Sequence, residues 1–378
     1  MRSTLRPPNR STTLARRCIL ALLLAAALPV QADSPANPKN QAGSSVKADP
    51  KARTDYTGEY VNFSDWKEVQ LFCDEMVRNH GFERSALDAL FAQVRYVDTT
   101  LQLIKPAPPG KPKNWQAYRA RFVEPVRIDA GVQFWNDNVA ALARAESEYG
   151  VPAEVIIGII GVETLYGRNT GRFRVLDALT TLAFDYPPTV TREARMAFFR
   201  SELESALLFA RQDKIDPLSL LGSYAGAVGL PQFMPSSIIK YAVDFDGDGV
   251  IDLRNSSPDA IGSIANYLVQ HGWQRFDAAP FVYPVSVSFD QAWQPLLNLG
   301  LQATLSEPQL QTAGISSSNP LPAGQKFGLV DLQNGAEASE YWLATNNFYA
   351  ITQYNRSYFY AMSVLELGRA VRLARTMQ

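Results

Sequence analysis

The spacing of apolar residues predicts helices over most of the chain. Between Phe63 and Val94 the apolar side chains recur at helical intervals, and Gly81 divides this stretch into two segments. A second helical pattern runs from Asp129 to Tyr149. Three further stretches have the same spacing, at residues 192–211, 258–272 and 358–375. These patterns predict a mainly helical protein.

One predicted helix is apolar on every side. It begins near Pro152, a residue suited to a first helical turn, and continues through Ile157 and Ile160 to Glu163. A helix without a polar face must lie in the interior of the protein. The sequence therefore predicts a buried helix that ends in one carboxylic acid and breaks at Gly167.

The region from Phe281 to Asn355 has a different pattern. Residues 281–287 and 326–332 resemble strands, and Gly, Ser, Asn and Pro are frequent between them. The chain is therefore expected to have an α+β fold that is mainly α. We divide it into a signal peptide (1–32), a flexible linker (33–58), a helical core with an acidic loop at 244–259 (59–280), a small β-containing subdomain (281–355) and a C-terminal helix that returns to the core (356–378).

The first 32 residues have the organisation of a secretory signal. Five arginines precede an apolar run from Cys18 to Leu28, and small residues lead to a predicted cleavage site after Ala32. The run is well short of the roughly 20 residues needed to span a bilayer, and Cys18 lies too early for a lipid anchor. We expect a periplasmic protein without a transmembrane segment once the signal is removed. Arg16 and Arg17 leave twin-arginine export open.

The charge and cysteine content of the chain without its signal peptide limit its possible partners and cross-links. Removing the five arginines leaves a net charge of about −6, which argues against nucleic acid as a partner. Cys73 is the one cysteine that remains, so no internal disulfide is expected.

Glu163 is the candidate catalytic residue. Burial raises the pKa of a carboxyl group because it disfavours the charged form, and the negative end of the helix acts in the same direction. A glutamic acid that holds its proton near neutral pH can donate it to a leaving oxygen. The alternative is a Glu at the solvated rim of a core helix, paired with Arg168 or Arg172.

Two sequence runs surround this acid with recognisable motifs, Gly161–Gly167 (GVETLYG) and Gly222–Ser237 (GSYAGAVGLPQFMPSS). Together they resemble the B-type lytic murein transglycosylases, glycoside hydrolase family 103. The resemblance covers about residues 60–374. It implies a lysozyme-like helical core with a helical subdomain and a small antiparallel β subdomain.

The resemblance also implies a reaction on peptidoglycan. Such enzymes cleave the β-1,4 bond between N-acetylmuramic acid and N-acetylglucosamine and leave 1,6-anhydromuramic ends. Glu163 would act first as general acid and then as general base, and the substrate's acetamido group would replace a second carboxylate. Two alternatives remain open: a lysozyme-type hydrolase, and a non-catalytic peptidoglycan-binding or scaffolding protein. A monomer without an organic cofactor is expected.

Residues expected to bind the sugar follow from the same resemblance. Ser223 would orient Glu163 or the acetamido group, and Gln232 would hold a sugar; the alternatives are a turn cap and a surface amide. Phe233 is either groove wall or core. Arg192 and Arg195 are uncertain contacts for peptide carboxylates. The aligned groove tyrosines are Tyr118, Tyr267, Tyr354 and Tyr360.

An acidic loop matches the first nine positions of an EF-hand. Its oxygen ligands would be Asp244, Asp246, Asp248 and the carbonyl of Val250, and four aspartates so close together repel one another without a cation. Asn255 stands where the closing Glu would be. The family resemblance implies a longer loop, closed by Asp259 with Asp252 acting through water. We expect a structural Ca²⁺; the alternative is an acidic surface turn.

Overall fold

The computed structural model describes residues 63–377 except 106–109, 111, 276–279 and 298. The helices are α1 (Lys67–His80), α2 (Arg84–Phe91), α3 (Asp98–Leu103), α4 (Trp115–Arg119), α5 (Pro125–Asp137), α6 (Val139–Tyr149), α7 (Ala153–Thr164), α8 (Val175–Phe184), α9 (Arg192–Gln212), α10 (Pro235–Tyr241), α11 (Ser257–Gln270), α12 (Glu307–Thr312), α13 (Asn346–Thr352) and α14 (Tyr358–Thr376). Two 3₁₀ turns, η1 (Phe63–Asp65) and η2 (Gln294–Leu296), complete the helical elements. The predicted signal peptide and linker lie outside the described residues.

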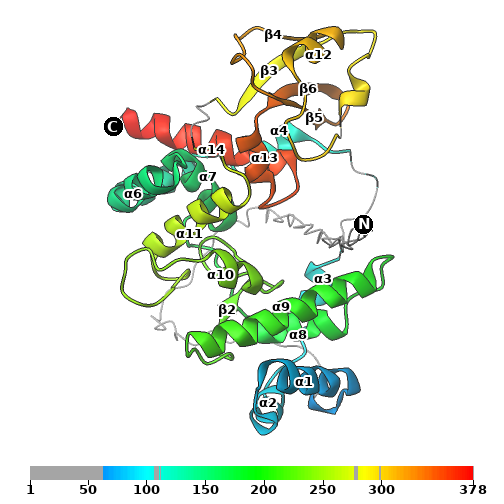
Figure 1. Ribbon diagram of the computed structural model, residues 1–378, viewed down its shortest axis with the longest axis vertical. Coiled ribbons are helices and arrows are strands. Elements are labelled where there is room, and N and C mark those ends of the chain that lie inside the picture. Colours follow the sequence, from blue (N-terminus) through cyan, green and yellow to red (C-terminus); the bar gives the residue numbers. More distant parts are fainter. Residues whose placement is uncertain (1–62, 106–109, 111, 276–279, 298, 378) are drawn as a thin grey trace, which may run out of the picture.

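The molecule is elongated, with a helical core between two smaller parts (Figure 1). Helices α1 and α2 lie at one end beside α8 and α9, and a four-stranded sheet lies at the other end. Helices α6, α7, α11 and α14 lie between these two ends, and α5 packs against α14. The predicted mainly α fold with a small antiparallel sheet is confirmed. The domain boundaries given above remain predictions.

Most predicted helices are confirmed, with one correction. The pattern from Asp129 to Tyr149 was expected to form a single helix, but it forms two, α5 and α6, which meet at Asn138. Helix α5 also begins earlier, at Pro125, because Glu124 caps it by accepting a hydrogen bond from the Val126 amide. Asn138 leaves the helical conformation with φ −123° and ψ 25°.

Helix α7 forms the centre of the core, as its composition predicts. Ten of its twelve residues are buried. It packs antiparallel against α14, and glycines bring the two backbones close together. A Cβ atom at Gly158 would lie 2.1 Å from the Val364 carbonyl oxygen, and one at Gly368 would lie 2.0 Å from the Glu154 carbonyl oxygen. Only glycine allows this close approach.

The sheet has the order β4-β3-β6-β5 and is antiparallel throughout. Strands β3 (Val282–Val287) and β5 (Gly328–Asn334) match the two predicted strands, whereas β4 (Ile315–Ser317) and β6 (Glu337–Ala344) were not predicted. Strand β6 begins with four polar or small residues, which hid its pattern. Two two-residue strands, β1 (Phe173–Arg174) and β2 (Leu221–Gly222), pair in the core.

The two faces of the larger sheet have different neighbours. Val330 and Leu332 of β5 join the main core, while Leu329 and Leu343 pack into a separate small core with Trp293. Helices α12 and α13 also fall within the region expected to be β-containing. Within the described part of the chain, no helix is long and apolar enough to cross a membrane. Cys73 is buried as a free thiol.

Candidate active site

Glu163 lies in the last turn of α7, just before the chain reverses. Leu165, Tyr166 and Gly167 all have left-handed backbone conformations, with φ of 50°, 56° and 87°. The Thr164 hydroxyl stabilises this turn because it accepts a hydrogen bond from the Gly167 amide and donates to the Leu230 carbonyl. The helix thus ends one residue after Glu163, which places the acid at the end of the buried helix.

The carboxyl group of Glu163 lines a cavity of about 320 Å³. The walls come from helices α4, α7, α9 and α14 and from the loop 222–234, so segments far apart in sequence enclose the acid. The lining residues are Ile104, Tyr118, Phe122, Val162, Glu163, Arg195, Phe199, Ser223, Tyr224, Ala225, Ala227, Gln232, Met234, Tyr354, Asn355 and Tyr360. Among these described residues Glu163 is the only acid.

The Glu163 carboxyl has a raised pKa of about 7. Burial is the main cause, and a hydrogen bond from the Tyr360 phenol to Oε1, 2.6 Å long, opposes it by stabilising the carboxylate. Among the described residues neither Arg168 nor Arg172 forms an ion pair with Glu163. Glu163 is therefore not a rim residue paired with an arginine, which was the alternative interpretation of the sequence.

Two of the four predicted tyrosines form a stack beside the acid. The rings of Tyr354 and Tyr360 lie 6.3 Å apart at an interplanar angle of 16°. The Tyr354 hydroxyl donates to the Pro231 carbonyl at 3.0 Å, which attaches the stack to the loop 222–234. Burial raises the pKa of both phenols well above the usual value, so both stay protonated near neutral pH.

Phe233 and Tyr267 lie behind this stack and are absent from the described cavity lining. Their rings are 5.9 and 4.8 Å from Tyr354, and both residues are buried. The Tyr267 hydroxyl donates to the Gln353 carbonyl. These two residues pack against Tyr354 and support it. Of the two alternatives for Phe233, groove wall or core, the structure therefore favours the core.

Tyr118 enters the cavity from α4. This short helix is fixed at its start by Asn114, whose side chain accepts a hydrogen bond from the Ala117 amide. The Tyr118 ring packs against Phe122 and Phe359, and burial raises the pKa of its phenol to about 12. Tyr118 is therefore a neutral aromatic wall with a polar tip.

The loop 222–234 places Ser223 and Gln232 at the cavity. The Ser223 hydroxyl oxygen accepts hydrogen bonds from the Ala225 and Ala227 amides, so this residue caps a turn and also lines the cavity. Gln232 has a left-handed φ of 51°, and its side-chain amide donates to the Gly229 carbonyl. The Ser223 proton and the Gln232 side-chain carbonyl remain as groups for a ligand.

The predicted arginines occupy different places. Arg195 lines the cavity, with its guanidinium over the rings of Tyr186 and Phe199. Arg192 donates to the Tyr186 carbonyl and pairs with Asp185. Sequence reasoning missed several lining residues. Tyr224 and Asn355 are the most polar of them, and each follows directly after a predicted site residue.

The acids downstream of Glu163 are engaged elsewhere. Asp177 is fully buried and forms an ion pair with Arg174 at 2.6 Å. Asp185 accepts a hydrogen bond from Tyr96 and pairs with Arg192. Neither lines the cavity, so the geometry is that of a site with one carboxyl group.

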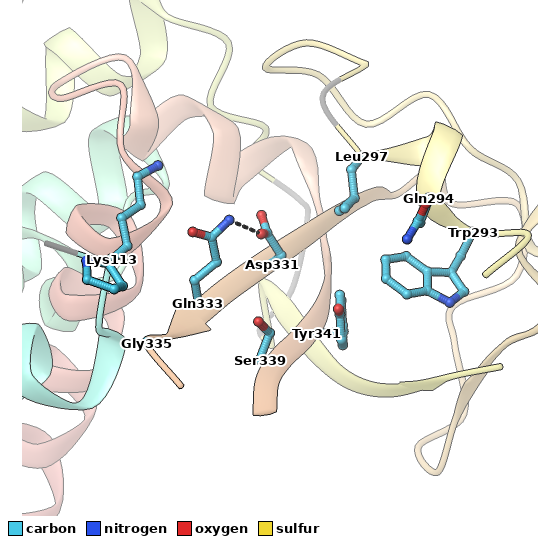
Figure 2. Close-up of a pocket in the computed structure, with 10 residues that line it drawn as sticks. Lys113, Trp293, Gln294, Leu297, Asp331, Gln333, Gly335, Ser339 and Tyr341 are labelled. Carbon is cyan, nitrogen blue, oxygen red and sulfur yellow. Dashed lines mark hydrogen bonds between the residues drawn. The ribbon is translucent and has the colours of Figure 1, made fainter. Parts of the chain in front are cut away.

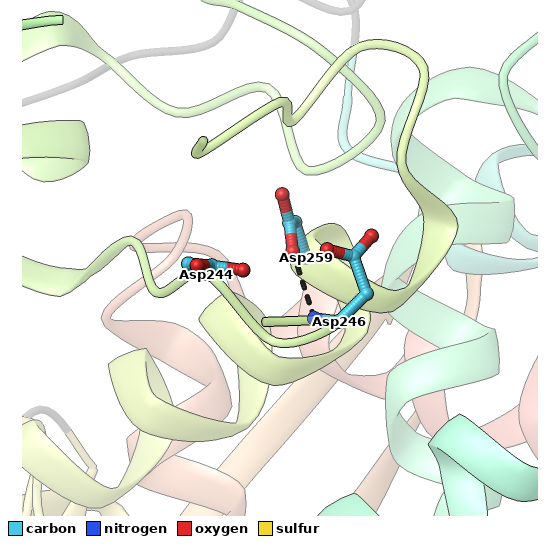
Figure 3. Close-up of side chains that lie close together, drawn as sticks. All are labelled: Asp244, Asp246 and Asp259. Atoms are coloured by element: carbon cyan, nitrogen blue, oxygen red, sulfur yellow. Dashed lines mark hydrogen bonds between the residues drawn. The ribbon is translucent and has the colours of Figure 1, made fainter. Parts of the chain in front are cut away.

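Three of the predicted metal ligands converge. Carboxylate oxygens of Asp244, Asp246 and Asp259 lie within 4.8 Å of one another (Figure 3). Asp259 lies at the start of α11 and is 1% exposed. An all-carboxylate set suits a hard cation such as Ca²⁺.

Asp248 and Asp252, two other predicted ligands, lie outside this cluster of described carboxylates. The backbone carbonyl of Val250 stays a predicted ligand. The Asp252 carboxylate accepts hydrogen bonds from the Arg254 and Asn255 amides, and the Asp248 carboxylate accepts one from the Val250 amide. Gly249 makes the expected sharp turn with φ 90°. Three acids thus form the candidate cation site, at the end of the loop next to α11.

The chain matches the family described as "Transglycosylase SLT domain" over residues 64–369. It is 44% identical over 323 residues to membrane-bound lytic murein transglycosylase B of Escherichia coli K12, covering 83% of this chain and 85% of that protein. The structure of soluble lytic transglycosylase SltB1 from Pseudomonas aeruginosa is similar, with a TM-score of 0.74, 46% identity, and 82% of this chain and 99% of that one covered.

A third relative is the E. coli lytic transglycosylase Slt35 in complex with calcium. Its TM-score is 0.73 at 44% identity, and the match covers 83% of this chain and 96% of that one. Family, relative and structures agree with the resemblance carried by the motifs around Glu163. The chain therefore belongs to the lytic transglycosylase family that carries the SLT domain.

Proposed function

We propose that this protein cleaves the β-1,4 bond between N-acetylmuramic acid and N-acetylglucosamine in peptidoglycan and leaves 1,6-anhydromuramic ends, with Glu163 as the single acid and base. The observation that carries the proposal is the position of Glu163, a carboxyl with a pKa of about 7 and the one acid among the described cavity residues. A group of this pKa is half protonated near neutral pH, so it can give and take a proton.

The reaction needs one proton to move twice. Glu163 donates its proton to the glycosidic oxygen as the bond to the muramic C1 breaks. The carboxylate then accepts the proton of the muramic C6 hydroxyl while that oxygen bonds to C1. Water is not consumed, and the enzyme returns to its starting protonation state. The substrate's acetamido oxygen stabilises the cationic intermediate in place of a second carboxylate.

Other residues of the cavity orient the acid and bind the sugar. Tyr360 donates to Oε1 of Glu163 and thus orients the carboxyl group. Tyr118 and Tyr354 provide aromatic walls against which sugar rings pack. Ser223 can donate its hydroxyl proton to the acetamido group, and Gln232 can accept from a sugar hydroxyl through its side-chain carbonyl.

A calcium ion at Asp244, Asp246 and Asp259 would act on structure and not on chemistry. When bound, it would neutralise three converging carboxylates. The acidic loop continues to Leu253, whose carbonyl accepts a hydrogen bond from the Leu230 amide of the active-site loop at 2.8 Å. The three aspartates therefore connect to the cavity through one backbone contact. We also propose that the protein is exported to the periplasm, on the basis of its first 32 residues.

Mass spectrometry of products from purified sacculi tests the reaction. Anhydromuramic ends, each lighter by one water than a reducing end, are the expected result. Reducing ends would identify a lysozyme-type hydrolase instead. Binding without any soluble product would favour the non-catalytic scaffold.

A further inference from the structure

A second hollow lies on the outer face of the β sheet, away from Glu163. It has a volume of about 580 Å³, within the range of sites that hold small ligands. Figure 2 shows Asp331, Gln333, Ser339 and Tyr341 on β5 and β6 between Lys113 on one side and Gln294 on the other. We call this hollow the sheet groove.

The groove exists because the small core covers only part of the outer sheet face. Leu329 and Leu343 on this face are buried under Trp293, but the next outward positions along the two strands are Asp331 and Tyr341. These two residues are direct cross-strand partners. The face thus changes from apolar to polar where the covering layer ends.

An aromatic ring forms the floor of the groove. The ring of Tyr341 packs edge-on against Trp293, with ring centres 4.7 Å apart. Trp293 is itself fixed by a hydrogen bond from its indole nitrogen to the Ser288 carbonyl, 2.9 Å long. Tyr341 is therefore a supported platform, of the kind on which a sugar ring can stack.

The polar groups around this floor fit a neutral ligand rich in hydroxyl and amide groups. Lys113 and Asp331 are the charged residues among the described lining, and their charges cancel. The Gln333 amide donates to Asp331 at 2.9 Å, which leaves the Gln333 side-chain carbonyl as an acceptor. Gln294 adds another amide from the opposite wall. Carboxylate, amide and hydroxyl groups beside an aromatic ring match the chemistry of a saccharide.

The sheet groove and the catalytic cavity are connected by one short segment. Lys113 lines the groove and Tyr118 lines the cavity, five positions apart. This segment is bound to the sheet, because the Gly335 amide donates to the Lys113 carbonyl at 2.8 Å and the Gln116 amide donates to Asn334 at 3.1 Å. With α4 helical, the two ends are on the order of 10 Å apart.

We propose that the sheet groove is an accessory saccharide-binding site that holds a stretch of the glycan strand beyond the sugars at Glu163. The proposal rests on the proposed function, since it takes the substrate to be a long glycan. Its ligand is the sugar backbone, not the stem peptide.

Binding measured without turnover tests the groove independently of the chemistry. In a Glu163→Gln background, Gln294→Ala combined with Gln333→Ala should lower the affinity for peptide-free glycan strands by about five- to tenfold, as expected for two lost hydrogen bonds. The matched control is Gln302→Ala with Gln311→Ala, two exposed glutamines beside the same sheet but outside the groove. The control should bind like the parent.

Two results would overturn the proposal. One is an unchanged affinity in the groove variant when its melting temperature equals that of the parent. The other is competition by free stem peptide where peptide-free glycan does not compete. A failure of the proposed function has a separate signature, because the wild type would then release no anhydromuramic products from sacculi whatever the groove binds.

Discussion

The Tyr360 phenol donates a 2.6 Å hydrogen bond to Oε1 of Glu163 across 197 residues of sequence. Their meeting follows from the antiparallel register of α7 and α14, in which Gly158 faces Val364 and Glu154 faces Gly368. One more turn along both helices brings Glu163 opposite Tyr360. The pKa of the acid thus depends on the packing of two helices as well as on its own burial.

Replacing the acid should remove catalysis and leave the fold intact. Glu163→Gln keeps the shape of the side chain but cannot transfer a proton, so we expect the rate of sacculus lysis to fall by about 10³-fold or more. Lysis is measured as loss of turbidity and binding as co-sedimentation with sacculi. If this variant binds sacculi and lyses them at the wild-type rate, the catalytic acid is another residue.

The acid should also affect stability in a pH-dependent way. Its pKa rises from 4.5 to about 7 on folding, so the protonated form favours the folded state. This contribution is fully present below pH 4.5 and is lost as the pH rises through 7. The melting temperature of wild type should therefore fall relative to that of Glu163→Gln over this interval. Parallel curves would mean that the pKa of Glu163 is unshifted.

Removing the Tyr360 hydroxyl should move the alkaline limit of activity. The hydrogen bond stabilises the carboxylate, so Tyr360→Phe should raise the pKa of Glu163 further, by about one unit for a hydrogen bond to a charged group. The alkaline limb of the kcat/KM profile reports this pKa.

Tyr354→Phe is the matched control for that experiment. It removes the hydroxyl that donates to the Pro231 carbonyl and keeps the stacked ring beside Tyr360. Its alkaline limb should stay in place. Equal shifts in the two variants would show that loop movement, and not the phenol, sets the pKa of the acid.

Calcium should stabilise the protein through the acidic loop. Millimolar calcium should raise the melting temperature by several degrees relative to chelator, because it binds the folded form alone. Asp246→Asn should abolish most of this gain, since Asp246 belongs to the converging carboxylates. Asp290→Asn, an exposed acid next to the sheet, should keep it. Identical melting curves with calcium and chelator would refute the metal site.

The glycine contacts between α7 and α14 should be intolerant of a methyl group. Gly158→Ala would place a Cβ 2.1 Å from the Val364 carbonyl oxygen, and this contact can be relieved only if the helices separate. We expect a loss of about 1–3 kcal/mol of unfolding free energy, as for other overpacked cores. Denaturant unfolding measures it. An unchanged midpoint would mean that the two helices do not pack this closely.

Sequence patterns predicted those features that depend on residues close together in the chain. The burial of α7 followed from a helix without a polar face, and the acid at its end followed from the motif around Glu163. The break at Asn138 was missed because apolar residues continue through it at nearly the same spacing. Strand β6 was missed because its first half faces solvent.

The environment of the acid depends on contacts between distant segments. Tyr360 was expected to bind sugar, yet its hydroxyl reaches Glu163, and only the helix register reveals this. Tyr267 aligns with a groove tyrosine of the family, but its ring lies behind that of Tyr354. Asp248 and Asp252 have the spacing of metal ligands but lie outside the three converging carboxylates, so their role as ligands stays a prediction. The spacing of residues in the sequence predicted which segments form the site, and the fold determines which of their side chains meet.

The dependence of Glu163 on α14 also determines when the enzyme can become active. Tyr360 belongs to α14, 197 residues after the acid, so α14 must be synthesised before the acid gains its partner. A fragment that ends before Tyr358 retains the acid but loses the helix that covers it. Proteolytic removal of α14 should thus inactivate the protein and not release an unrestrained lytic fragment.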